Sequence, residues 1–79
     1  MASVLSRTYK LFKISKVDSK EKLVKEFPNN YEAMYKIKGI LGLAEFRKCG
    51  FEYDPYTGTN VFKEGKKIFS IHKELEYDV

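Results

Sequence analysis

The second half of the chain consists of three short runs of aromatic and β-branched residues, separated by two turn signals. The first signal is the segment Asp54-Pro55-Tyr56-Thr57-Gly58, and the second is Glu64-Gly65. In the first segment the aspartate accepts local backbone hydrogen bonds, the proline presets φ, and the glycine supplies a positive φ. Strand-forming runs that are joined by such turns predict a three-stranded antiparallel meander over residues 51–72.

The register of the second turn decides which side chains share a face of this meander. A two-residue loop places Val61 opposite Ile68 and leaves Phe62, Phe69 and Ile71 on the other face. A three-residue loop instead groups Val61, Phe69 and Ile71, and it sets Phe62 opposite Ile68. Either loop leaves large apolar groups on both faces, and helices cover one of them. The other face is then a docking surface, a dimer interface, or the seat of the N-terminal segment.

Residues 8–17 have the composition of a strand without a clean alternation of apolar and polar positions. A β-bulge at Leu11-Phe12 restores the alternation. The inward side chains are then Tyr9, Leu11 or Phe12, and Ile14, and the outward ones are Lys10, Lys13 and Ser15. A helix over the same residues is the alternative.

A short helix is predicted after this strand. Asp18 has the position of an N-cap, and Glu21 follows three residues later as its capping partner. Pro28 ends the helix, whose apolar side consists of Leu23, Val24 and Phe27.

A second, longer helix is predicted to begin at Tyr31 with Asn30 as its N-cap. Gly50 is expected to end it. Gly39 and Gly42 each cost about 1 kcal/mol relative to alanine in a helix interior, so a bend or break is expected there unless they allow close packing. A break near Gly39 would leave residues 43–48 as a separate turn. Its apolar stripe has helical spacing and consists of Ala33, Met34, Ile37, Leu41 and Ala44.

Length and composition predict one small globular domain over residues 1–79, with 43% hydrophobic residues. The predicted fold class is α+β, with an N-terminal strand, two helices and the meander in the order β-α-α-β-β-β. The single cysteine excludes an internal disulfide, and one histidine leaves no metal-ligand spacing, so no cofactor is expected. The chain shows neither a signal peptide nor an apolar stretch approaching about 18 residues, which predicts a cytoplasmic protein, in the host cytoplasm if it is viral.

The residue pattern favours a binding protein over an enzyme. Cys49 and His72 are the only cysteine and histidine, and Cys49 next to Gly50 is better explained as a small, partly buried residue. Glu52 and Asp54 would be the paired carboxylates for acid–base chemistry, but the turn accounts for Asp54. The five glycines match no phosphate-binding loop.

Positive charge is concentrated in the N-terminal third, where residues 7–25 contain seven basic residues and two acidic ones. A basic face predicts attraction to nucleic acid, although charge runs are also common on purely solvated surfaces. With two arginines against thirteen lysines, we expect contact with the phosphate backbone and weak sequence preference. The predicted nucleic-acid-binding residues are Lys10, Lys13, Lys16, Lys63, Lys66 and Lys67, with Tyr53 and Tyr56 available to stack on bases.

The alternative partner is a protein, bound by an inhibitor or adaptor of the kind found in phages and mobile elements. Its anchors would be Phe62, Ile68 and Phe69 on the aromatic sheet face. A homodimer through that face is a further alternative. The strand, Asp-Pro-x-Thr-Gly, strand stretch resembles segments of phage and bacterial proteins, including the start of some HNH endonucleases. No nuclease activity is implied, because the paired-histidine motif is absent.

Overall fold

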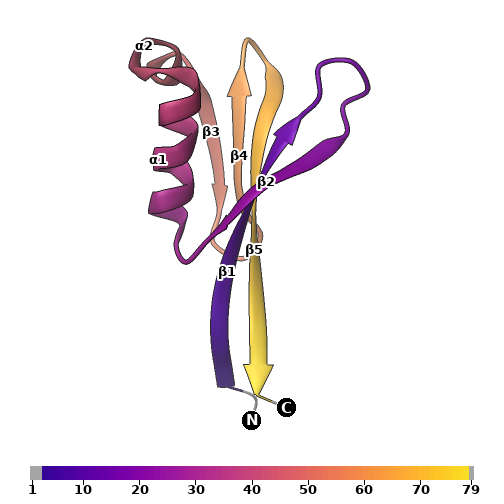
Figure 1. The fold of residues 1–79 in the computed structure, drawn as a ribbon, viewed down its shortest axis with the longest axis vertical. Coiled ribbons are helices and arrows are strands. Elements are labelled where there is room, and N and C mark those ends of the chain that lie inside the picture. The colour runs from indigo at the N-terminus through magenta and orange to yellow at the C-terminus, as the bar shows by residue number, and fades with distance from the viewer. Residues whose placement is uncertain (1–2, 79) are drawn as a thin grey trace.

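The computed structural model describes residues 3–78, which form one antiparallel sheet and two helices (Figure 1). Strands and helices follow the order β-β-α-α-β-β-β. Their bounds are β1 Ser3–Ile14, β2 Glu21–Phe27, α1 Asn30–Leu41, α2 Leu43–Arg47, β3 Gly50–Asp54, β4 Gly58–Lys63 and β5 Lys66–Asp78.

The sheet has five strands in the order β2-β1-β5-β4-β3. The three C-terminal strands are neighbours in it, but β5 also pairs with β1 at the centre of the sheet. The predicted order β-α-α-β-β-β is therefore wrong: β3, β4 and β5 pair antiparallel in sequence, but they belong to a five-stranded sheet that also contains β1 and β2. The molecule is a small α+β structure.

The largest departure from the prediction is residues 21–27, which form strand β2 instead of a helix. The Asp18 carboxylate accepts a hydrogen bond from the Lys20 backbone N–H at 3.1 Å, so it closes the β1–β2 turn instead of capping a helix. A helix of this length is marginal alone, whereas β2 gains a backbone ladder with β1. Leu23 and Val24, expected on a buried side, are exposed.

The irregularity at Leu11-Phe12 is present, but only in the pairing of β1 with β2. Leu11 pairs with Lys25 and Phe12 with Leu23, so the extra residue is Val24 of β2. Against β5, β1 runs through this point in unbroken register. Lys10 and Lys13 therefore lie on opposite faces of the sheet, and the prediction that both face outward together is wrong.

Helix α1 is capped by Asn29, whose Oδ1 accepts the Glu32 backbone N–H at 2.8 Å, and not by Asn30. Of the two glycines at which a break is expected, Gly42 is the one that separates α1 from α2, with a φ of 84°, and α1 continues through Gly39. Ala33 and Ile37 are buried on the predicted stripe, whereas Ala44 lies beyond the break and is exposed. Gly50 begins β3 instead of ending a helix.

The β4–β5 turn combines the two registers considered for it. Glu64 and Gly65 have φ values of 53° and 79°, the type I′ pattern, and Lys63 pairs with Lys66 across a two-residue loop. The register then shifts, so Val61 pairs with Phe69. One extra residue in β5, Ile68, thereby places Val61, Phe69 and Ile71 on one face.

The core lies between this face and α1. Its buried members are Leu11, Ala33, Ile37, Val61, Phe69 and Ile71. Two buried hydroxyls are satisfied by asparagines: Thr59 donates to Asn30 Oδ1 at 3.1 Å, and Ser70 donates to Asn60 Oδ1 at 3.0 Å. Asn30 thus ties the start of α1 to β4, which positions the helix over the sheet.

Candidate functional site

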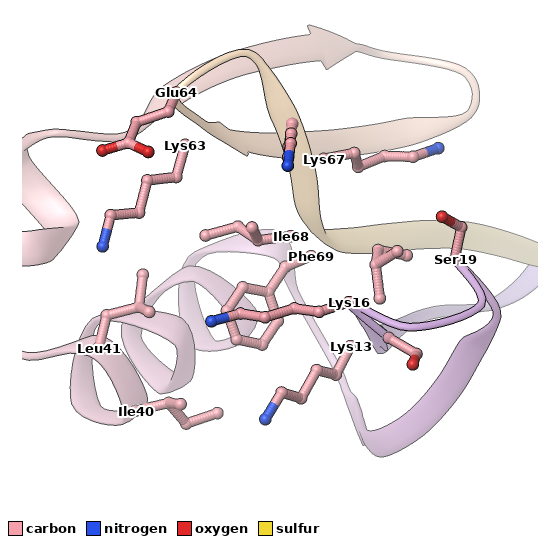
Figure 2. A pocket seen from close by; sticks show the side chains of 13 residues that line it. Lys13, Lys16, Ser19, Ile40, Leu41, Lys63, Glu64, Lys67, Ile68 and Phe69 are labelled. Carbon is pink, nitrogen blue, oxygen red and sulfur yellow. The ribbon is translucent and has the colours of Figure 1, made fainter.

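A pocket of about 830 Å³ opens where three parts of the chain meet. Its walls are the end of β1 with the loop that follows it, the C-terminal end of α1, and the β4–β5 turn (Figure 2). The type I′ turn ends β4 and the break at Gly42 ends α1, both at the same edge of the molecule. The ends of these elements therefore surround the pocket.

Five lysines line this pocket, and we call them the lysine rim: Lys13, Lys16, Lys63, Lys66 and Lys67. They come from segments about fifty residues apart in the sequence, and all five were predicted as nucleic-acid-binding residues. Glu64 is the one acidic residue among the described residues that line the pocket. The rim therefore carries a clear excess of positive charge.

One member of the rim is neutralised by a neighbour. The Lys63 ammonium group donates a hydrogen bond to the Glu45 carboxylate of α2. This bond raises the pKa of Lys63 and lowers the pKa of Glu45, which Lys48 also approaches. With the charged groups of residues 6–76, Lys13, Lys16, Lys66 and Lys67 form no salt bridge. These four ammonium groups are available to an external anion.

The base of the pocket is apolar. Phe69 and Ile14 are buried there, Leu41 and Ile68 are half-buried, and the Ile40 side chain of α1 is 44% exposed. Figure 2 shows Ile68 and Phe69 between the lysines of the two walls, with Ile40 and Leu41 on the helix beside them. We call Ile40, Leu41 and Ile68 the apolar floor.

Lys10 lies apart from the rim, because β1 alternation turns it to the opposite face from Lys13. Its ammonium group lies 2.9 Å from Glu74 and 3.7 Å from Glu26, and the hydrogen bond with Glu74 is the main cause of its raised pKa. Lys10 is therefore a cross-strand pairing residue between β2, β1 and β5.

The structure does not bring Tyr53 and Tyr56 to the pocket either. Both are exposed, Tyr53 by 64% and Tyr56 by 85%. Tyr56 sits in the β3–β4 turn, at the opposite end of β4 from Lys63. A strand of six residues separates those ends by roughly 17 Å. Neither tyrosine can stack on a base held in this pocket.

The alternative protein anchors are divided between the core and the pocket. Phe69 is 2% exposed and belongs to the core, so it offers a partner almost no surface. Ile68 is half-buried in the apolar floor, and Phe62 is half-buried opposite Lys67. The three residues do not form the exposed aromatic face that was predicted.

Sequence reasoning missed Ile40 and Leu41 as pocket residues. Leu41 was assigned to the buried stripe of the helix, and Ile40 lies beside that stripe. The only signal in the sequence is that Ile40 is an apolar residue beside the buried stripe, at the end of a helix. This signal indicates a binding site only when the lysines are known to lie nearby.

A smaller depression of about 220 Å³ lies on polar residues of β4 and β5. Beside it, the His72 Nε2 atom lies 3.3 Å from a Glu21 carboxylate oxygen, and the His72 ring packs against Phe12. Cys49 is half-buried, and its Sγ donates to the Glu45 carbonyl oxygen. Among the side chains that the structure describes, those of residues 6–76, no three His, Cys, Asp or Glu cluster in a way that would hold a metal ion.

The arrangement of the main pocket suits a ligand that carries both anionic and apolar groups. No family model matches the chain, and neither a curated protein nor a solved structure does. Among the described helices, none has the length and apolar character needed to cross a membrane.

Proposed function

We propose that this protein is a small accessory protein that binds the phosphate backbone of nucleic acid at the lysine rim, with weak sequence preference. The observation that supports it is the convergence on one pocket of five lysines from two segments, residues 13–16 and 63–67, that lie about fifty residues apart in the sequence. Bringing like charges together costs free energy because they repel each other, and binding of an anionic partner offsets that cost.

The chemistry of the rim favours the backbone over the bases. Lysine binds phosphate as a point charge, whereas guanine in the major groove is read chiefly by bidentate arginine. Neither of the two arginines, Arg7 and Arg47, lines the pocket. Contacts that end on phosphates position a protein on nucleic acid without selecting a sequence.

The proposal predicts a defined dependence of binding on salt. Four unpaired lysines that neutralise four phosphates give a slope of log K against log salt of about −3.6 on duplex DNA and about −3 on a single strand. Fluorescence anisotropy of a labelled oligonucleotide, titrated at several salt concentrations, measures this slope.

Charge-removing variants locate the site. Lys13→Gln and Lys66→Gln, taken from opposite walls, should each reduce the steepness of the slope by about 0.7–0.9. Lys25→Gln is the matched control, because Lys25 is an exposed lysine of β2 outside the pocket. A slope near zero for the unmodified protein, or equal losses in all three variants, would refute the proposal.

A further inference from the structure

We infer that the pocket takes single-stranded nucleic acid, with one unpaired base on the apolar floor and the flanking phosphates on the lysine rim. This inference rests on the proposed function and names its substrate class. It depends on three features of the pocket: its concave shape, its apolar floor, and the placement of lysines on two facing walls.

The shape of the site separates a single strand from a duplex. At about 830 Å³ the pocket has the size of small-ligand sites, not of a flat electrostatic surface. A duplex keeps its bases stacked inside, and bringing one of them into a pocket requires that the base be unpaired and unstacked, which costs free energy. A single strand presents unpaired bases without that cost.

The apolar floor provides exposed apolar surface on which a base can pack. Ile40 is 44% exposed at the C-terminal end of α1, next to the half-buried Leu41 and Ile68. Phosphates resting on the rim would leave this surface in contact with water, whereas the flat face of a base would bury it. Every base has such a face, so the contact is compatible with weak sequence preference.

The two walls place charge on both sides of the floor. Lys13 and Lys16 come from the end of β1 and its following loop, and Lys66 and Lys67 come from the start of β5. Figure 2 shows Lys13 and Lys16 on one wall and Lys63 and Lys67 on the facing wall. A nucleotide seated between them has a phosphate on each side, and each phosphate meets a different wall.

The test compares three labelled probes by fluorescence anisotropy: an oligodeoxythymidylate of about twelve nucleotides, an abasic strand of equal length, and a duplex of equal length. We expect the thymidylate strand to bind about tenfold more tightly than the abasic strand, and more tightly than the duplex. Equal affinity for the thymidylate and abasic strands, or tighter binding of the duplex, overturns the inference while the proposed function stands. Failure of all three probes to bind refutes the proposed function itself.

A pair of variants tests the floor directly. Ile40→Ser should bring the affinity for the thymidylate strand close to that for the abasic strand and leave abasic binding unchanged. Leu43→Ser is the matched control, because Leu43 is 47% exposed on α2 and lies outside the pocket. Both positions are exposed, so thermal melting should show both variants folded. A folded Ile40→Ser protein that still prefers the thymidylate strand by tenfold contradicts the inference.

Discussion

At the scale of single residues, Gly58 is the glycine at which an added side chain meets other atoms. It is buried at the start of β4 with a φ of 125°, a conformation that residues with a side chain rarely adopt. A Cβ atom there would also overlap the backbone carbonyl of Ile71 on β5. Close approach of two backbones at this point lets the Thr57 carbonyl accept the Lys73 N–H at 2.9 Å.

We predict that Gly58→Ala destabilises the fold by more than about 2 kcal/mol, because strained backbone and overlap with β5 act together. The midpoint and slope of urea unfolding measure this loss. Gly39→Ala is the control with the opposite sign, since nothing lies within 4 Å of a Cβ at Gly39 in α1. It should stabilise the protein by about 1 kcal/mol. Equal unfolding midpoints for the two variants would contradict the assignment.

At the scale of elements, the Glu45–Lys63 pair links α2 to β4. The hydrogen bond from Lys63 lowers the pKa of Glu45 below its ordinary value of 4.5. The folded protein therefore holds this carboxyl group deprotonated more strongly than the unfolded chain does. Its stabilising contribution is complete above the ordinary pKa and is lost as the pH falls through the lowered one.

We predict that Glu45→Gln lowers the melting temperature only slightly at neutral pH, because the pair is partly exposed and solvent screens it. The difference from the unmodified protein should disappear as the pH falls below 4.5 and the native carboxyl group becomes protonated. Melting curves recorded from neutral to acidic pH measure it. A difference that grows on acidification has the wrong sign for this pair.

At the scale of the whole molecule, β1 and β5 form a central pair that extends beyond the other strands. Their register runs from Ser3 opposite Asp78 to Lys13 opposite Phe69. Pairing of β1 with β2 begins only at Tyr9, and pairing of β5 with β4 ends at His72. The remaining ends form a two-stranded arm, which projects from the sheet toward both termini (Figure 1).

We predict that this arm opens more readily than the rest of the sheet. A ribbon of two strands with no further neighbours is marginally stable in water. Amide hydrogens of residues 6–8 and 74–76 should exchange with solvent at least about a hundredfold faster than those of residues 10–12 and 70–72. Hydrogen exchange followed by NMR gives these rates residue by residue. Uniform protection along β1 and β5 would contradict the prediction.

Local chemistry was readable from the sequence because it acts over a few residues. The Asp54 carboxylate accepts the Tyr56 and Thr57 backbone N–H groups at 2.7 and 3.2 Å, as the turn signal predicted. Glu64 and Gly65 form the second predicted turn, and Ala33 and Ile37 are buried on the predicted stripe. Five of the six lysines predicted to bind nucleic acid line one pocket.

Tertiary structure decided the features that depend on distant partners. Pairing of β1 with β5 joins residues that are 56 to 75 positions apart in the sequence. This pairing places β1 inside the sheet, where its other edge pairs with β2. The residues after Asp18 then became a strand, and Lys10 was separated from Lys13 by the sheet. Turns and caps depend on hydrogen bonds between residues that are close in the sequence. Strand pairing and the assembly of a pocket depend instead on contacts between segments that are remote in the sequence.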